Sequence, residues 1–388
     1  MEFIDLKAQY RLLAGTIQDR MQKVIENGHF ILGPEVFELE AKLAEYVGVE
    51  HCVSCANGTD ALQMALMAKG IGPGDAVFTS PFTFIATSEV IALLGATPVF
   101  VDIDPLTYNL DPVKLAEAVI SLKQGRRPSP GSPLGLHPKA VIPVDLFGLP
   151  ADYGAIKKIA DAEGLFVLED AAQSFGGTSP FGKAGILGDV AATSFFPAKP
   201  LGCYGDGGAL LTNDAILADL LRSIRMHGKG EDKYENVRTG INSRLDTLQA
   251  AVLLAKLEIF PDELELRRKI ATRYSEGLKG VVETPIIPEG YASAWAQYSV
   301  RSPYRPQLIA ALKQEGIPTM VYYPKPLHLQ KANLALGYLT GSFPISERVA
   351  TEIFSLPMHP YLSEGDQSQI IMAVRKYVKL SNSKGANH

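Results

Sequence analysis

The sequence predicts an α/β protein in which helices sandwich a mostly parallel sheet, followed by a smaller C-terminal α+β domain. Up to about residue 250, short apolar segments alternate with segments of helical periodicity. The apolar segments lack strict polar/apolar alternation, which indicates strands covered by helices on both faces. Strands interleaved with helices in this way are typical of βαβ units and a parallel sheet.

Turn signals separate these units: "GIGPGD" (70–75) and "GATP" (95–98) end helices and lead into strands. A longer helix is expected over 243–278, with a kink near Pro261. Beyond it the alternation of strand and helix patterns gives way to a smaller α+β unit. This unit has short segments at 296–302, 306–316 and 318–324 and a last helix around 364–380. Strands of the large domain are expected at 51–56, 75–80, 97–104, 139–146 and 165–170, with helices at 60–70, 85–95 and 152–164.

The chain therefore divides into a large domain (1–258), a small domain (259–380) and a disordered tail (381–388). The Pro- and Gly-rich segment 124–138 is expected to be a surface excursion before the next strand, and its role is not evident from its residues.

Composition argues against several classes of partner. The chain has 388 residues, of which 46% are hydrophobic and 20% charged, as in an ordinary soluble protein. Its net charge of -5 is unfavourable for binding nucleic acid or an anionic membrane. It has no run of about 20 apolar residues, and its N-terminus lacks the pattern of a signal peptide. With three cysteines, a disulfide framework is not expected, and we expect a cytoplasmic protein.

Cys52 and Cys55 match the CxxC spacing of redox and metal motifs. The alternative is a short buried strand in which cysteine serves as a small apolar residue. No second CxxC completes a zinc site, so we expect no metal.

The stretch "ANGTDAL" (56–62) lies where a strand ends and a helix begins. Backbone N–H groups at such a helix start bind phosphate, and the hydroxyl of Thr59 beside Gly58 adds a donor. Ordinary capping of the helix by Thr59 or Asp60 explains the same residues.

Two further stretches carry chemistry. "FVLEDAAQSFG" (166–176) delivers Glu169 and Asp170 to the C-terminal end of a strand, where a carboxylate pairs with a cationic ring nitrogen or caps the next helix. In "SFFPAKPLGCYGDGGAL" (194–210), Lys199 lies between two prolines before a glycine-rich loop. A lysine with a lowered pKa forms a Schiff base with an aldehyde, while Thr193 and Ser194 offer hydroxyls to a phosphate.

A fourth stretch, "TGINSRLDTLQAA" (239–251), places Asn242 and Arg244 before the long helix, where a solvated helix start is the alternative. A phosphate cup, a carboxylate for a ring nitrogen and an amine for an aldehyde are together the requirements of pyridoxal 5′-phosphate (PLP). The sequence therefore predicts a PLP enzyme.

The chain resembles the DegT/DnrJ/StrS sugar aminotransferases, a branch of the fold-type I PLP-dependent transferases. The resemblance runs through "FIDLKAQY", "ILGPEVFELE", "CANGTDAL", "VFVDID", "EDAAQSFG", "SFFPAKPLGCYGDGGA", "NSRLDTLQAA" and "LPMHPYL". Within the family it is most similar to enzymes that aminate the 3-keto group of UDP-N-acetyl-hexuronates for O-antigen and lipopolysaccharide sugars.

The resemblance implies roles for individual residues. Lys199 forms the Schiff base with PLP, Asp170 keeps the ring nitrogen protonated, and Gln173 lies near the ring hydroxyl. Phe84 stacks on the ring. The resemblance further implies phosphate binding by Gly58, Thr59 and Ser194, and residues reaching the site from the other subunit of a homodimer, Asn242 and Arg244.

The same resemblance places Tyr322, Tyr323 and His328 at the sugar pocket, with a core or surface role for His328 as the alternative. Many relatives have His-Tyr where this chain has Tyr322-Tyr323, a difference that concerns the sugar pocket and leaves the cofactor chemistry untouched. L-Glutamate is the implied amino donor and a nucleotide-linked keto sugar the acceptor.

Other functions compete with this interpretation. The acceptor is alternatively a 4-keto-6-deoxy or dTDP-3-keto sugar nucleotide. A sugar dehydratase of the same family carries histidine in place of Lys199. A PLP-binding regulator without catalysis lacks support from any basic DNA-binding segment, and a nucleotide-binding oxidoreductase lacks the required GxGxxG after a strand.

Overall fold

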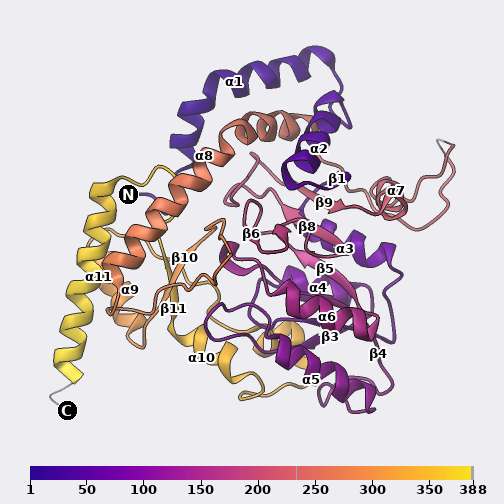
Figure 1. Cartoon of the computed structure of the whole chain (residues 1–388). Helices are drawn as coiled ribbons and strands as arrows, with labels where there is room; N and C mark the ends of the chain where they lie inside the picture. Colours follow the sequence, from indigo (N-terminus) through magenta and orange to yellow (C-terminus); the bar gives the residue numbers. More distant parts are fainter. Residues whose placement is uncertain (233, 386–388) are drawn as a thin grey trace.

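A computed structural model describes residues 1–232 and 234–385 of the chain. Its centre is a seven-stranded sheet in the order β1-β9-β8-β5-β4-β2-β3 (Figure 1). β9 runs antiparallel to both neighbours, and the pairs from β8 to β3 are parallel. The predicted mostly parallel sheet is thereby confirmed. The strands are β1 (His51–Cys55), β2 (Asp75–Thr79), β3 (Thr97–Phe100), β4 (His137–Ile142), β5 (Phe166–Asp170), β8 (Val190–Ser194) and β9 (Gly208–Thr212).

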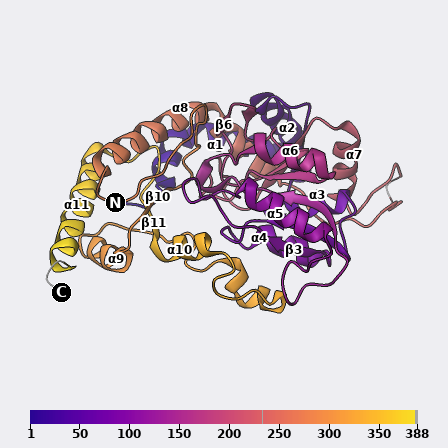
Figure 2. The ribbon, with the colours of Figure 1, turned by 60° about the horizontal axis from the view of Figure 1, so that its bottom comes forward.

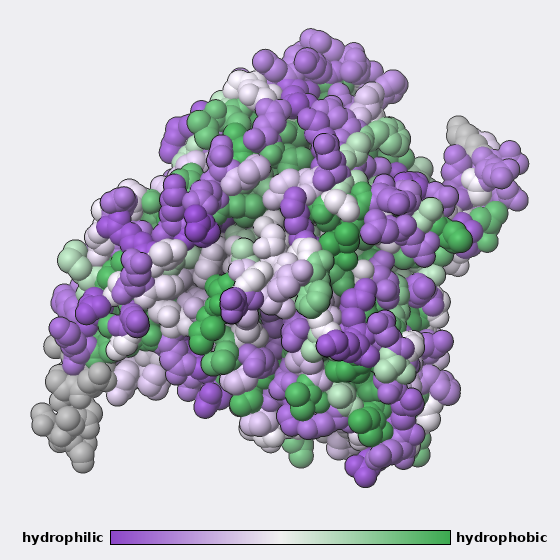
Figure 3. Space-filling model, viewed as in Figure 1, coloured by the Kyte–Doolittle hydropathy of each residue, from purple (hydrophilic) through white to green (hydrophobic). Residues whose placement is uncertain are grey.

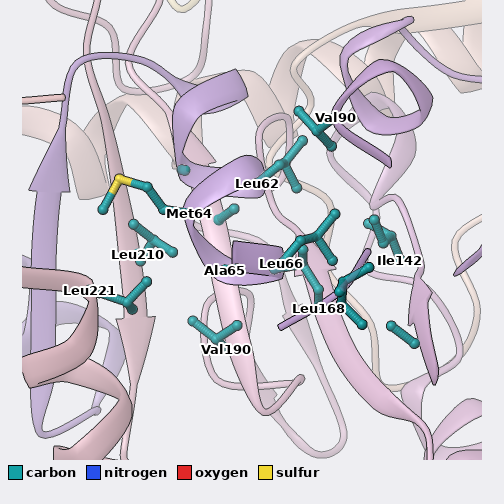
Figure 4. Packing of buried hydrophobic residues seen from close by; sticks show 14 of the residues in the cluster. Leu62, Met64, Ala65, Leu66, Val90, Ile142, Leu168, Val190, Leu210 and Leu221 are labelled. Carbon is teal, nitrogen blue, oxygen red and sulfur yellow. The ribbon is translucent and has the colours of Figure 1, made fainter. Parts of the chain in front are cut away.

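Both faces of the sheet are buried under helices, as the lack of alternation predicts. Leu168 of β5 packs in one apolar cluster, while its neighbour Val167 packs in another on the opposite face. Figure 4 shows Leu62 and Leu66 packing with strand residues, among them Leu168, in the first cluster. The helices of the large domain are α1 (Leu6–Asn27), α2 (Pro34–Val47), α3 (Gly58–Ala68), α4 (Ala86–Leu93), α5 (Pro112–Lys123), α6 (Tyr153–Glu163) and α7 (Ala215–Ile224).

The long predicted helix is present as α8 (Thr247–Leu278), with Pro261 inside it. The first half of α8 lies against α1 and α2, and its second half packs in the core of the small domain. The expected boundary at residue 258 thus falls within one continuous helix. The helices α1, α2, α5 and α7 were not among the expected elements.

The small domain combines a two-stranded antiparallel sheet with helices. Figures 1 and 2 both place α9 and α11 at the end of the molecule opposite α7, on the side of the N-terminus, whereas the helix Pro344–Glu352 lies against the large domain, where Asp102 binds its first residues. The expected element at 318–324 forms only an isolated bridge from Met320 to Ser355. The elements are β10 (Tyr298–Arg301), β11 (Ile353–Leu356), α9 (Arg305–Gln314), α10 (Pro344–Glu352) and α11 (Glu364–Gly385).

The last helix, α11, continues to Gly385, so residues 381–385 are helical where a disordered tail was expected; residues 386–388 lie outside the described residues. Among the described residues, no helix has the length and apolar character needed to cross a membrane. Figure 3 shows hydrophilic and hydrophobic residues interspersed over one face.

The excursion 124–138 packs against the small domain. The Gly131 N–H donates to the Leu336 carbonyl at 2.9 Å, and a Cβ at Gly131 would lie 2.0 Å from the Ala335 carbonyl oxygen. Only glycine allows this approach of the two backbones. The excursion therefore packs against the backbone at Ala335 and Leu336 and holds that segment of the small domain in place.

Cys52 and Cys55 are buried, free thiols in β1. Burial raises the pKa of both, which disfavours the thiolate needed for redox or metal chemistry. The CxxC spacing is thus accounted for by a buried strand.

Candidate active site

Asp170 lies at the carboxyl end of β5, buried to 4% exposure. Its Oδ2 accepts from the Thr87 hydroxyl at 2.8 Å and its Oδ1 from the Ala172 N–H at 3.3 Å. Burial raises the pKa of Asp170, whereas these two donors and the charge of Lys199 lower it. The carboxylate is therefore held in place and close to a cation.

Glu169, one residue earlier, points away from Asp170 because side chains alternate along a strand. Its carboxylate accepts from the N–H groups of Gly185, Leu187 and Gly188 at 2.6, 2.8 and 3.3 Å. Glu169 thus holds a neighbouring loop and has no free oxygen for a ligand. Of the two acids at this strand end, the site contains Asp170.

Lys199 lies on a loop between β8 and β9 that closes on itself. Its backbone N–H donates to the Phe196 carbonyl at 2.8 Å. A Cβ at Gly202 would lie 2.6 Å from the Pro197 carbonyl oxygen, so the loop closes only with glycine there. The Lys199 side chain is half-buried; burial lowers the pKa of its amine, and the charge of Asp170 opposes that shift. Such an amine gives up its proton more readily than an exposed lysine does.

The end of β8 faces the start of α3. A Cβ at Gly58 would lie 2.7 Å from the Ser194 Cβ, so these two residues touch backbone to side chain. The side chain of Asn57, rather than that of Thr59 or Asp60, caps the helix by accepting from the Asp60 N–H at 2.8 Å. The Thr59 hydroxyl is therefore not the helix cap, and the capping explanation for it does not hold.

Thr193 does not join this site. It is fully buried, and its hydroxyl donates to the Ala171 carbonyl at 3.2 Å. The expectation that it offers a hydroxyl to a phosphate is therefore wrong, because its side chain points to the interior face of β8. Ser194, on the other face, is partly exposed.

Gln173 and two aromatic residues complete the centre. The Gln173 Oε1 accepts from the Phe147 N–H at 2.9 Å, and its Nε2 donates to the Tyr323 hydroxyl at 3.4 Å. The Tyr323 ring lies 6.5 Å from that of Phe84. Phe84 is 56% exposed, which leaves an apolar ring face open to a planar ligand.

Tyr322 lies beside this centre and packs against the N-terminal segment, with its ring 6.5 Å from that of Phe3. His328 is fully buried, pairs through Nε2 with Glu347 at 3.0 Å, and lies 4.7 Å from the Phe343 ring. Burial lowers the pKa of His328. This position fits the core role that the sequence left open for His328.

Asn242 and Arg244 lie in a different hollow of about 390 Å³, which they line together with Ala56, Gly205 and Asp206. Asn242 is exposed and Arg244 half-buried. The lining of this hollow includes neither Asp170 nor Lys199. The structure of one chain thus gathers Asp170, Gln173, Lys199, Tyr323 and Phe84, and leaves these two outside.

Sequence reasoning missed residues that hold the site from a distance. Thr87 binds Asp170 from α4, 83 positions earlier in the chain, and no local pattern marks it. The capping role of Asn57 could have been predicted, since asparagine is a preferred residue directly before a helix.

The residues present fit the shape and chemistry of PLP. An aldehyde requires an amine of lowered pKa, a pyridine nitrogen requires a fixed carboxylate, and a phosphate requires a helix start without side-chain bulk. Lys199, Asp170 and Gly58 meet these three requirements, and the exposed face of Phe84 suits an aromatic ring.

Comparisons with known proteins agree with a PLP site in this chain. The UDP-2-acetamido-2-deoxy-3-oxo-D-glucuronate aminotransferase of Pseudomonas aeruginosa is 51% identical over 363 residues, 93% of this chain and 96% of that protein. The crystal structure of a DegT DnrJ EryC1 StrS aminotransferase from Brucella abortus superposes with a TM-score of 0.93 at 57% identity, covering 97% of this chain and 99% of that one. NtdA from Bacillus subtilis, solved with bound pyridoxamine phosphate, gives a TM-score of 0.85 at 28% identity over 97% of this chain and 83% of its own.

Residues 12–375 match the DegT/DnrJ/EryC1/StrS aminotransferase family over nearly the whole chain. Pyridoxamine phosphate, the cofactor in the NtdA structure, is the aminated form of PLP. The chain therefore belongs to the DegT/DnrJ/EryC1/StrS aminotransferase family and is a PLP-dependent aminotransferase.

Proposed function

We propose that this enzyme moves the amino group of L-glutamate onto C3 of a nucleotide-linked keto sugar, with UDP-2-acetamido-2-deoxy-3-oxo-hexuronate as the acceptor. The observation that carries the reaction is the pairing of Lys199, with its lowered pKa, and the fixed carboxylate of Asp170 in one buried site. The substrate rests on the 51% identity to the Pseudomonas aeruginosa enzyme.

PLP, when bound, supplies an aldehyde that condenses with amines and a cationic ring that withdraws electrons from the adjacent carbon. The Lys199 amine would act as the base that takes the proton from the donor's α-carbon in the first half-reaction, and as the acid that gives a proton to C3 of the acceptor sugar in the second. Burial lowers the pKa of this amine, which favours the neutral form that a base requires. Asp170, oriented by Thr87, keeps the ring nitrogen protonated throughout.

Other residues bind and orient. Gly58, Thr59 and Ser194 receive the phosphate, and the exposed ring of Phe84 covers one face of the cofactor. Gln173 orients the ring hydroxyl from its contact with Phe147.

Tyr322 and Tyr323 line the acceptor pocket, where Tyr323 is already bound to Gln173. His328 acts on that pocket only through the packing of its segment, given its burial against Glu347. Asn242 and Arg244 enter the active site of the other subunit of a homodimer, which accords with their position in a separate hollow of their own chain. The product serves the synthesis of O-antigen, lipopolysaccharide or related glycans in the cytoplasm.

A single-turnover assay tests the proposal. PLP-loaded enzyme is treated with L-glutamate and then offered a panel of keto sugar nucleotides, while the visible absorbance of the bound cofactor is followed. Recovery of the starting spectrum with only the UDP-3-oxo-hexuronate supports the proposed acceptor. Recovery with a 4-keto-6-deoxy or dTDP-3-keto sugar keeps the aminotransferase and overturns the sugar.

The same assay separates the alternatives. Glutamate that never changes the spectrum overturns glutamate as the donor, and no response to any donor or acceptor favours a PLP-binding regulator. In Lys199→Ala we expect PLP to bind without its lysine-linked absorbance and turnover to fall by at least about a thousandfold. A Lys199→Ala enzyme of normal activity would remove Lys199 from the chemistry.

A further inference from the structure

A third carboxylate, Asp145, lies in the turn that follows β4 and is fully buried. Its Oδ1 accepts from the Ala151 N–H at 2.9 Å and from the Tyr153 hydroxyl at 3.0 Å, and its Oδ2 accepts from the Ser174 hydroxyl at 2.7 Å. Its own backbone N–H donates to the Asp170 carbonyl at 3.1 Å. Asp145 thus touches both ends of segment 170–174.

This segment carries the two groups proposed to hold the cofactor ring, Asp170 and Gln173. The next residue of the turn also binds it, since the Phe147 N–H donates to Gln173 Oε1 at 2.9 Å. Four hydrogen bonds from this turn, at the Pro143 carbonyl, Asp145 N, Asp145 Oδ2 and Phe147 N, therefore hold the segment. Two of these four involve Asp145.

The turn itself is held in an uncommon backbone conformation. Phe147 has a φ of 59°, which non-glycine residues rarely adopt. The Gly148 carbonyl accepts from the Ala294 N–H at 2.9 Å, and a Cβ at Gly148 would lie 2.7 Å from the Trp295 nitrogen. The turn is thus clamped between the small domain and the cofactor segment, and strained residues of this kind gather at functional sites.

A buried carboxylate is costly for folding unless its contacts compensate. Burial raises the pKa of Asp145 to about 7, while its hydrogen bonds from Ala151, Ser174 and Tyr153 lower it. Among the residues that the structure describes, no cation pairs with Asp145; its two carboxylate oxygens accept from Ala151, Tyr153 and Ser174. The contacts that compensate for the burial of Asp145 are therefore the ones that hold the turn and segment 170–174 in place.

We propose that Asp145 is a positioning residue for the transamination: it sets segment 170–174 so that Asp170 and Gln173 meet the cofactor ring in the right geometry. The inference rests on the proposed function, because it needs PLP to be bound by Asp170 and Gln173. It adds to that function a residue that touches neither substrate nor cofactor.

Asp145→Asn is the direct test, because it keeps the shape of the side chain and its acceptor for Ala151 and Tyr153. The amide nitrogen cannot accept from the Ser174 hydroxyl but can donate to its oxygen, so the bond to the carboxylate becomes a weaker bond of reversed direction. This weakening is expected to raise the dissociation constant of PLP about fivefold. The visible circular dichroism of the bound cofactor is expected to change as well, since it reports ring orientation.

Asp102→Asn is the matched control. Asp102 is also a buried carboxylate, but it binds Ile345 and Ser346 at the start of α10. We expect it to lower the melting temperature of the apoenzyme while the dissociation constant and circular dichroism of PLP stay as in the wild type. An Asp145→Asn enzyme that behaves in the same way as this control overturns the proposal.

Ser174→Ala removes the same contact from its other end and carries the test if Asp145→Asn does not fold. If both side chains act through this one hydrogen bond, the double variant binds PLP no more weakly than Ser174→Ala alone. Fully additive losses, or wild-type PLP affinity in both single variants, contradict the proposal. Failure of the wild-type chain to bind PLP would instead be a failure of the proposed function.

Discussion

Gly58→Ala is the sharpest test of where the cofactor phosphate binds. An ideal Cβ at Gly58 lies 2.7 Å from the Cβ of Ser194, 3.2 Å from its Oγ and 3.3 Å from its Cα. Carbon atoms in contact normally stay about 3.5–4.0 Å apart, so the start of α3 and the end of β8 have to separate by about 1 Å.

The two consequences of this separation differ in size. Overpacking costs about 1–3 kcal/mol, of which the better helix propensity of alanine returns up to about 1 kcal/mol. The net loss of stability is thus about 0–2 kcal/mol. A phosphate hydrogen bond stretched by about 1 Å is no longer a hydrogen bond, and losing one to a charged oxygen costs about 1.5–3 kcal/mol. This loss corresponds to a PLP dissociation constant about 10- to 150-fold higher.

The assay is titration of the apoenzyme with PLP, together with its thermal unfolding. Gly15→Ala is the control, because Gly15 lies in α1 with nothing within 4 Å of its Cβ position. It is expected to raise the stability by up to about 1 kcal/mol and leave PLP affinity unchanged. Adding Ser194→Gly to Gly58→Ala removes the 2.7 and 3.2 Å contacts and is expected to recover part of the lost stability, but not the affinity, since the hydroxyl is gone. Wild-type PLP affinity in Gly58→Ala would refute the phosphate site at α3.

Two further predictions concern buried charges. Lys256 is 1% exposed and donates to the Gly202 carbonyl at 2.6 Å, and burial lowers its pKa from 10.5 to about 8. Between pH 8 and 10.5 the unfolded chain binds a proton that the folded lysine has released. The free energy of unfolding of the wild type, relative to that of Lys256→Met, therefore rises with pH by up to about 3 kcal/mol. Denaturant unfolding of both proteins at pH 7.5 and 10.5 measures this difference, and a difference that does not change with pH contradicts the prediction. Arg225 and Glu40 form a buried ion pair at 2.6 Å. Arg225→Leu alone is expected to lower the free energy of unfolding by about 3–5 kcal/mol, because it leaves the buried Glu40 without its cation. The double variant Arg225→Leu/Glu40→Leu is expected to lose less stability. Thermal unfolding compares the two, and equal losses would show that the pairing is unimportant.

The sequence alone determined the features that depend on local patterns. The sheet, the long helix α8 and the loop around Lys199 each follow from residues close together in the chain. Tight turns, apolar strands and helix periodicity act over only a few positions, so one segment is enough to predict them. The same local reasoning led to the cofactor, because three short segments each met one of its requirements.

Only the tertiary structure decided which of two neighbouring residues faces the site. Alternation along a strand indicates that Glu169 and Asp170 point to opposite sides, as do Thr193 and Ser194, but not which side is the site. The answer comes from partners far away in the chain, such as Thr87 for Asp170. The burial of His328 against Glu347 and the position of Asp145 behind Asp170 were likewise decided by packing between segments. Contacts of this kind depend on which chain segments meet in the folded protein, and no local pattern in one sequence encodes that choice.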